Sequence, residues 1–391
     1  MSGRPFLQIP GPTNVPDRIL RALSKPTIDH RSPEFGELGL AVMAGLRKII
    51  GSSGPLFIYP ASGTGAWEAA LVNTLSPGDQ VLMVETGHFA KLWGELAGNL
   101  GLRPDILPGD WRSGADASAI EDALRRDSDK SIRAVCVVHN ETSTGCTSPV
   151  ADIRAALDAT GHRALLMVDT ISSLGSIAYD HDRLGVDVTI GCSQKGLMLP
   201  PGLSFNAVSE KALTASQHAT IAKSYWSWKA MAAANRTGHF PYTPPTNLLY
   251  GLREAIAMFE EEGLENILAR HVRHAIATRA AVEAWGLDIV CRNPRDYSSS
   301  LTAVFMPEGF SADNFRAAVA KEFNMSLGNG LSRLANRVFR IGHLGDFNDL
   351  MLAGTLSGIE MGLAICQVPH REGGVQAALA SLQRTAGAAR A

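Results

Sequence analysis

The sequence predicts an α/β fold built on a mainly parallel sheet, and three observations support this. Between about residues 55 and 210, short apolar runs alternate with segments of helical periodicity. Several of the runs are apolar without alternation, which is typical of strands covered on both faces. Repeated strand–helix–strand units place such strands side by side in parallel. The 391 residues are also enough for a large domain and a second, smaller one.

Six strands are expected in this first region, each an apolar run bounded by turn-forming residues. They are 55–60 (PLFIYP), 80–85 (QVLMVE), 133–140 (RAVCVVHN), 164–170 (ALLMVDT), 186–192 (VDVTIGC) and 203–209 (LSFNAVS). Helices are expected between them at 66–75, 119–127 and 150–160. Pro149 and Asp152 suit the start of the third helix, because proline and acidic residues are favoured near a helix N-terminus.

After about residue 245 the pattern changes to long helix and then to a shorter α+β region. Residues 248–286 have nearly continuous helical periodicity, with a break expected at Gly263 and Leu264. We therefore predict a large domain at 1–265 and a small C-terminal domain at 266–391, with a linking helix around 246–285. The small domain should contain strands near 300–307 and 337–343 and helices near 313–323 and 350–365. The tail from about residue 370 is expected to fray.

Composition excludes several classes of protein. A net charge of −2 and the lack of a dense Lys/Arg block give no electrostatic argument for a nucleic-acid or anionic-membrane partner. No apolar run approaches the roughly 20 residues that span a bilayer, and the N-terminus lacks the apolar segment of a secretory signal. Five scattered cysteines without a CxxC pair predict reduced thiols in a cytoplasmic protein, with neither a disulfide frame nor a metal site.

The segment SGTG follows an expected strand and opens an expected helix. Backbone N–H groups and hydroxyls at a helix N-terminus bind anions, so Ser62, Gly63 and Thr64 could hold a phosphate. A plain helix-start turn is an equally good interpretation of this segment alone. A Walker loop is excluded because Gly-Lys-Ser/Thr is absent. Glu68 replaces the third small residue of a dinucleotide fingerprint, which argues against an NAD-dependent dehydrogenase even though Glu85 lies at a suitable distance for a ribose contact.

Two charged residues lie at the ends of neighbouring expected strands. Asp169 ends an apolar strand, where open α/β sheets bind ligands, although a carboxylate there can also cap a turn. Lys195 lies between two apolar stretches, and burial would lower its pKa and make its amine a nucleophile. Taken alone, this lysine could also extend along the surface to solvent. A phosphate turn, a carboxylate and a lysine amine together fit pyridoxal phosphate, which has a phosphate, a pyridine nitrogen and an aldehyde.

The motifs SGTG, HNETSTG, VDTISSLG, SQKGL and RVFRIGHLG, in this order, resemble those of the class V, fold-type-I aminotransferases. The resemblance runs from GPTNVP near the N-terminus to about residue 365 and is closest to the serine–glyoxylate and alanine–glyoxylate aminotransferases. It implies a large domain with a mainly parallel seven-stranded sheet and a small α+β domain. It also implies transfer of an amino group from a small L-amino acid to glyoxylate, giving glycine and a 2-oxo acid. Serine is the first choice of donor, with aspartate and alanine as alternatives.

The resemblance assigns the cofactor contacts residue by residue. Lys195 matches the Schiff-base lysine, and Asp169 matches the partner of the pyridine nitrogen. Gln194 matches a contact of the cofactor phosphate. The remaining phosphate contacts match the turn Ser62, Gly63 and Thr64.

The resemblance also implies the walls of the site and its substrate contacts. Ile171 would pack against the cofactor ring, and Phe89 would stack on it where relatives carry Trp or His. Thr142 matches a hydroxyl near the ring oxygen and the substrate. Arg340 matches the arginine that binds the substrate α-carboxylate, for which a planar and always charged fork is suited. A surface arginine on an edge strand is the alternative for Arg340.

The segment FPYTPP matches one that reaches across a dimer. Tyr242 and Thr243 would contact the cofactor phosphate of the other subunit, which implies a homodimer with shared active sites and leaves a tetramer open. A cysteine desulfurase is a weaker alternative on the same fold. It needs a mobile cysteine late in the chain, whereas Cys366 lies in an apolar helical pattern.

Overall fold

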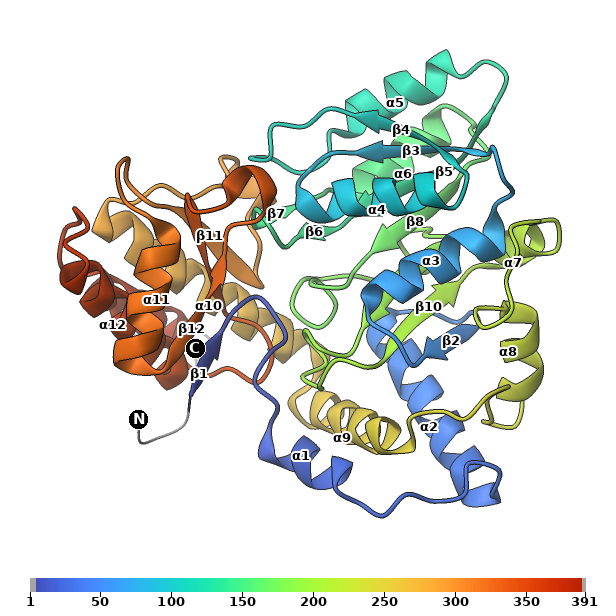
Figure 1. Ribbon diagram of the computed structural model, residues 1–391, viewed down its shortest axis with the longest axis horizontal. Helices are drawn as coiled ribbons and strands as arrows, with labels where there is room; N and C mark the ends of the chain where they lie inside the picture. Colours follow the sequence, from blue (N-terminus) through green and yellow to red (C-terminus); the bar gives the residue numbers. More distant parts are fainter. Residues whose placement is uncertain (1–4, 389–391) are drawn as a thin grey trace.

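A computed structural model describes residues 5–388 and contains two main sheets (Figure 1). The larger sheet has seven strands, and the prediction of a mainly parallel α/β sheet is confirmed. Every neighbouring pair is parallel except the two that involve β10. In spatial order the strands are β2 (Leu56–Tyr59), β10 (Ser204–Val208), β9 (Val188–Cys192), β8 (Leu165–Asp169), β5 (Ile132–Val138), β3 (Gln80–Val84) and β4 (Arg103–Leu107).

The central strands were visible in the sequence because both of their faces are covered. All residues of β2, β8, β9 and β10 are buried. The edge strand β4, with sequence RPDIL, was missed. It carries exposed charged residues and a proline, which are typical of an edge strand and hide the apolar pattern.

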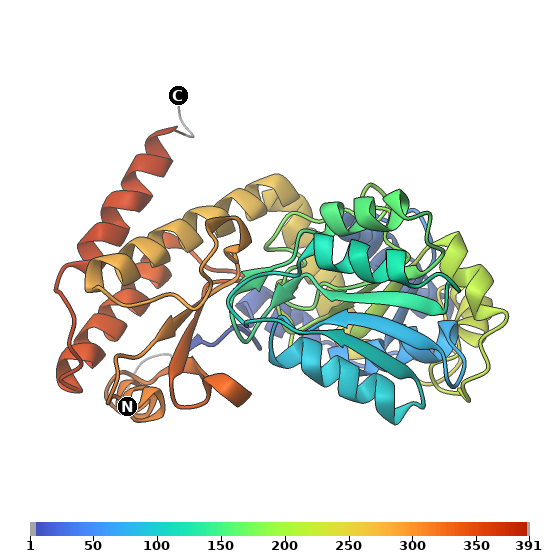
Figure 2. The same ribbon diagram turned by 90° about the horizontal axis from the view of Figure 1, so that it is seen from above.

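Helices cover both faces of the larger sheet (Figures 1 and 2). On one face, α3 (Gly63–Thr74) and α4 (His88–Asn99) pack their buried tryptophans against the strands. The opposite face carries α2 (Pro33–Ile50), α5 (Ala117–Arg126), α6 (Val150–Ala159) and α9 (Thr246–Glu262). The shorter elements are α1 (Asp17–Leu23), α7 (Glu210–Ser216), α8 (Trp228–Asn235) and the hairpin of β6 (Asn140–Glu141) and β7 (Cys146–Thr147).

The second sheet joins the two ends of the chain. Its order is β1 (Phe6–Gln8), β12 (Met325–Asn329), β13 (Val338–Gly342) and β11 (Leu301–Phe305), and β1 pairs with β12 in parallel. Strands β11 and β13 lie where the sequence predicted them. Strand β1 was missed because it has only three residues, and β12 was missed because its sequence MSLGN is not a continuous apolar run. The adjoining helices are α10 (Leu264–Trp285), α11 (Ala312–Phe323), α12 (Asp349–Ile365) and α13 (Gly374–Ala388).

The predicted helix break lies between α9 and α10. Gly263 has φ 83°, a conformation that glycine adopts without strain, and it separates the two helices. The linking region is thus two helices, of which α9 packs on the larger sheet and α10 on the second (Figure 1). The domain boundary at residues 265 and 266 stays a prediction.

The expectation of a frayed tail from residue 370 is wrong for most of that segment. Helix α13 extends to Ala388, and its buried residues include Ala378 and Leu382. An alanine-rich segment has high helix propensity and forms a helix when a packing surface is present. None of the helices described within residues 5–388 is both long and apolar enough to cross a membrane.

Candidate active site

A cavity of about 180 Å³ lies at the carboxyl ends of the parallel strands and the start of α3. Most of the predicted cofactor contacts line it: Ser62, Gly63, Thr64, Phe89, Thr142, Asp169, Ile171, Gln194 and Lys195. Sequence reasoning missed the other lining residues, Gly11, Pro12, Trp67, Val138, Asn140 and Pro201. The chain therefore brings together, at one sheet edge, motifs that lie more than a hundred residues apart.

Lys195 is buried at the turn that follows β9, so the alternative of a surface lysine is wrong. Its amine donates a hydrogen bond to the carbonyl of Pro10. Burial lowers the pKa of this amine to about 8; Cys192 opposes the effect, Arg340 adds to it, and Asp169 opposes it. About a tenth of the amine is therefore uncharged at pH 7, far more than for an ordinary lysine.

Gly11 lets the N-terminal segment enclose this lysine. A Cβ atom at Gly11 would lie 2.2 Å from Lys195 Cδ, and the residue has φ 90°. Both the close approach and the left-handed backbone require glycine. Thr13, two residues later, also holds the N-terminal segment against the Lys195 turn, because its Oγ1 donates to the Lys195 carbonyl at 3.1 Å. The PGPT segment near the N-terminus is thus a wall of the site.

Asp169 ends β8 with a side chain that is buried and bonded on both oxygens. The backbone N–H of Ile171 donates to Oδ1 at 2.6 Å, and Trp67 Nε1 donates to Oδ2 at 2.8 Å. Burial raises the pKa of the Asp169 carboxyl to about 7, against the effect of these two hydrogen bonds. Glu141 raises this pKa further and Lys195 lowers it. A cationic ring nitrogen would favour the ionised carboxylate.

Ser62 differs from the other serines that begin helices. Ser32, Ser209 and Ser227 each accept a backbone N–H with their side chains, whereas Ser62 makes no such bond at the start of α3. Its hydroxyl and the first N–H groups of α3 therefore remain available to an anion. Nearby, Gln194 lines the cavity, and its side-chain amide nitrogen could donate to the same anion, whereas its oxygen is an acceptor without a partner among residues 5–388. This end of the cavity suits a phosphate.

The walls beside the lysine include Phe89, Ile171 and Thr142. The Glu141 carboxylate accepts the backbone N–H groups of Phe89 at 3.3 Å and Ala90 at 3.1 Å, which fixes the start of α4. Thr142 Oγ1 donates to Ser172 Oγ at 2.7 Å. The flat apolar wall and the hydroxyl lie where a planar ring with polar edges would fit.

Asn140 is a functional candidate that the sequence reasoning did not identify. It lines the cavity, and its Oδ1 is buried without a partner among residues 5–388. Its Nδ2 donates to Ser172 Oγ and to Ser300 Oγ, each at 2.8 Å. Its position in HNETSTG, two residues before Thr142, was the available signal.

Arg340 lies beside the cavity and does not line it. It is buried on β13, between β11 and β12, so the alternative of a surface arginine on an edge strand is wrong. Its Nη1 donates to the Thr142 carbonyl at 2.8 Å and its Nε to the Asn329 carbonyl at 2.7 Å. Burial lowers the pKa of Arg340 to about 10, which still leaves it charged at neutral pH. Among residues 5–388, no hydrogen bond is made by its Nη2 group.

Tyr242 and Thr243 do not line the cavity of their own chain. Tyr242 stacks on Tyr225 with ring centroids 4.3 Å apart, and its hydroxyl has no hydrogen-bond partner among the described residues. Thr243 is exposed. Their predicted contact with the site of another subunit stays a prediction.

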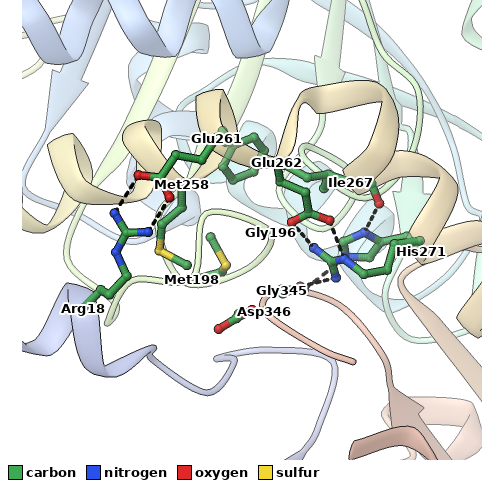
Figure 3. Close-up of a pocket in the computed structure, with 12 residues that line it drawn as sticks. Arg18, Gly196, Met198, Met258, Glu261, Glu262, Ile267, His271, Gly345 and Asp346 are labelled. Atoms are coloured by element: carbon green, nitrogen blue, oxygen red, sulfur yellow. Dashed lines mark hydrogen bonds and ion pairs between the residues drawn. The ribbon is translucent and has the colours of Figure 1, made fainter. Parts of the chain in front are cut away.

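Figure 3 shows a second cavity, of about 320 Å³, next to the turn that carries Lys195. Gly196 and Met198 of that turn line it, together with residues of α1, α9 and α10. Its two arginines are paired with glutamates, whereas the lining residue Asp346 has no ion pair among residues 5–388. Arg18 donates to Glu261 at 2.5 and 2.8 Å, and Arg270 donates to Glu262 at 2.6 and 2.9 Å.

Comparisons with known proteins identify the family to which the chain belongs. The family model Aminotransferase class-V matches residues 7–334. A serine–glyoxylate aminotransferase of Methylorubrum extorquens is 48% identical over 92% of this chain and 91% of its own. An L-aspartate–glyoxylate aminotransferase of Paracoccus denitrificans is 41% identical over 97% of both chains. The crystal structure of ureidoglycine–glyoxylate aminotransferase from Bacillus subtilis has a TM-score of 0.90 and 26% identity, covering 98% of this chain and 99% of its own. The chain belongs to the class-V aminotransferase family.

Proposed function

We propose that this protein transfers the amino group of serine to glyoxylate, giving hydroxypyruvate and glycine. One observation carries the proposal. The amine of Lys195 and the carboxyl of Asp169 are both buried in one cavity, next to a helix start that can bind a phosphate. Two buried ionisable groups with pKa values near neutrality indicate a reaction site, because burial without function would favour apolar residues there.

Pyridoxal phosphate is the cofactor that the family implies, and the cavity residues fit it. The start of α3 and Gln194 would hold its phosphate, Asp169 its ring nitrogen and Lys195 its aldehyde carbon. The unpartnered polar atoms of Gln194 and Asn140 are further support, since buried polar atoms are normally bonded. When bound, the cofactor supplies a carbon that takes the amino group and a ring that accepts the electrons of the deprotonated donor.

The protein residues perform the steps around that chemistry. The Lys195 amine, once released, moves the proton that leaves the donor Cα, since its lowered pKa suits a general base at neutral pH. The Asp169 carboxylate keeps the ring nitrogen protonated. Arg340 binds the donor α-carboxylate through Nη2 and fixes Cα next to the lysine. The same residues act in reverse when glyoxylate takes the amino group, so the kinetics are ping-pong.

Serine is the first choice of donor. Relatives that are 48%, 44% and 42% identical are named serine–glyoxylate aminotransferases. Aspartate is the second candidate, from the 41% identical relative, and alanine the third, from one at 29%. Aspartate would need a second cation beside Arg340, and neither flanking residue offers one. His343 is buried with its pKa held well below the usual range by burial, and Arg337 is exposed and stacked on Phe305.

The desulfurase alternative has no support at the cysteine it requires. Cys366 follows α12, away from the cavity, and burial raises the pKa of its thiol. The solved cysteine desulfurase with 16% identity to this chain shows a shared fold only. Because the chain belongs to the aminotransferase family, the alternative of an NAD-dependent dehydrogenase is also set aside.

We further infer a homodimer in which Tyr242 and Thr243 reach the cofactor phosphate of the partner subunit, and a cytoplasmic location. The unpartnered Tyr242 hydroxyl and the exposed Thr243 support the first inference, and the five free thiols support the second. A Tyr242→Phe variant should bind the cofactor more weakly while remaining dimeric by light scattering.

A panel of amino donors with glyoxylate as acceptor tests the proposal. Serine should give the highest kcat/KM, and aspartate should be weaker by at least ten-fold. Borohydride treatment of the yellow protein should label the peptide that contains Lys195. A preference for pyruvate or 2-oxoglutarate over glyoxylate would reject the acceptor, and a colourless, unlabelled protein would reject the whole proposal.

A further inference from the structure

Asp169 receives a side-chain hydrogen bond that the family resemblance did not assign. The indole of Trp67 donates to Oδ2 at 2.8 Å, and it lines the same cavity. The other donor, the backbone N–H of Ile171, is present whatever the sequence is. Trp67 is therefore the one of the two donors that a side-chain substitution can remove.

The indole is held rigidly in place. Trp67 is 2% exposed and belongs to α3, whose first turn also forms the candidate phosphate site. Its ring stacks on Trp93 of α4, with centroids 5.7 Å apart and an interplanar angle of 11°. A stacked, buried ring on a helix cannot rotate away from the carboxylate, so one element positions both the phosphate turn and the donor to Asp169.

The charges around Asp169 leave its ionisation finely balanced. Desolvation and the nearby Glu141 favour the neutral acid, while the two hydrogen bonds and Lys195 favour the carboxylate. Two other titratable neighbours carry no charge at neutral pH: burial lowers the pKa of His139 to about 4 and raises that of Cys192 to about 12. Loss of one hydrogen bond to the anion would therefore leave the carboxyl mainly protonated at pH 7.

We propose that Trp67 is a positioning residue that keeps the Asp169 carboxylate ionised and turned toward the ring nitrogen of the cofactor. This inference rests on the proposed function. A protonated carboxyl could not stabilise a cationic ring nitrogen, so the indole N–H acts on the cofactor through Asp169. Trp67 would otherwise be only an apolar wall of the cavity.

The test uses a matched pair of variants. Trp67→Phe removes the indole N–H and keeps an aromatic ring for stacking. Trp93→Phe makes the same change in the stacked neighbour, whose Nε1 is also buried but has no hydrogen-bond partner among residues 5–388. A loss of packing should affect both variants, whereas the proposed role affects Trp67→Phe alone.

Two quantities should be measured for each variant. The titration of Asp169 is followed in the cofactor-free protein by carbon NMR of labelled aspartate, and the Kd of pyridoxal phosphate is followed by absorbance. We expect Trp67→Phe to raise the proton affinity of Asp169 about ten-fold and to weaken cofactor binding at pH 7 by a similar factor, with partial recovery at higher pH. Trp93→Phe should remain within two-fold of the wild type in both measurements.

Equal effects in the two variants, or no change of the Asp169 titration in Trp67→Phe, would overturn the inference. If Trp67→Phe does not fold, the wild type gives the answer instead, because the Trp67 indole N–H resonance should shift with the Asp169 titration while that of Trp93 does not. Resonances that move together would also overturn it. A wild type that binds no pyridoxal phosphate would reject the proposed function, and the Asp169 titration in cofactor-free protein would still decide the role of Trp67.

Discussion

The two cavities next to the Lys195 turn differ in how their charges are satisfied. The smaller one, of about 180 Å³, holds a buried lysine and a buried aspartate whose pKa values are both displaced by burial. The larger one, of about 320 Å³, is lined by arginines that are already bonded to glutamates (Figure 3). The difference shows that size is a poor guide to a site, and that buried ionisable groups with displaced pKa values are a better one.

The hydrogen bonds around the larger cavity also have a mechanical role. Arg270 donates to the carbonyls of Gly345 at 2.9 Å and Phe347 at 3.0 Å, and His271 accepts the Gly345 N–H at 3.1 Å. The loop that follows β13 is thereby tied to α10. Because β13 carries Arg340 and the same loop approaches Met198, these bonds hold the two sides of the reaction site together.

Replacement of Lys195 should have the largest effect. Lys195→Ala should lower kcat/KM by about 10³-fold or more, because the general base is lost, and borohydride labelling should disappear. Lys223→Ala is a matched control, since burial also lowers the pKa of that amine but its partners are the carbonyls of Ala219 and Ile221. Comparable losses in both variants would mean that lysine burial, and not the cavity, is responsible.

Replacement of Arg340 should have the second largest effect. Arg340→Lys keeps the charge but loses the fork, so the KM for the amino donor should rise about ten- to a hundred-fold. The exposed Arg337, three residues earlier, provides the control Arg337→Lys, which should leave KM unchanged. Steady-state kinetics on both variants separate KM from kcat, and a fall in kcat alone would contradict carboxylate binding.

The pH dependence of cofactor attachment should reveal the burial of Lys195. Its pKa is lowered to about 8, so the reactive neutral amine increases with pH, makes up half of the total near pH 8 and levels off above that value. The observed rate should therefore rise about ten-fold per pH unit below that value and then level off. Stopped-flow absorbance of the cofactor-free protein measures it, and a midpoint near that of an ordinary lysine would show that the amine is solvated.

The smallest effect on catalytic activity is expected from a substitution in the larger cavity. Arg270→Gln removes bonds to Glu262 and to the loop after β13, and should lower the free energy of unfolding by about 1–2 kcal/mol after allowance for its partial exposure. The kcat should stay within about three-fold of the wild type. Denaturant unfolding and steady-state kinetics measure the two, and a loss of activity as large as that of Arg340→Lys would break the distinction between the cavities.

The sequence predicted those parts of the site that lie in continuous motifs. Asp169, Lys195 and the Ser62 turn follow apolar strands, and parallel strands bring such ends to one edge. Gly11 and Trp67 could not be predicted in this way, since their roles arise from contacts with Lys195 and Asp169 that no local pattern records.

The strands also fall into two groups, those that the sequence predicted and those that it did not. Buried strands such as β8 were predicted because both faces are apolar, whereas β4 lies at an edge and β1 has only three residues. Pairing of β1 with β12 depends on segments more than three hundred residues apart. Local periodicity contains no information about such a contact, so only the folded structure shows it.

The pairing of β1 has a consequence for synthesis of the protein. Residues 6–8 leave the ribosome long before residues 325–327, with which they pair, and the backbone of Ile9 packs directly against Gly342 at the end of β13. Pro10 and Gly11, which enclose the lysine, thus reach their positions only after nearly the whole chain has been translated. In a nascent chain the lysine pocket would therefore stay incomplete until late in synthesis.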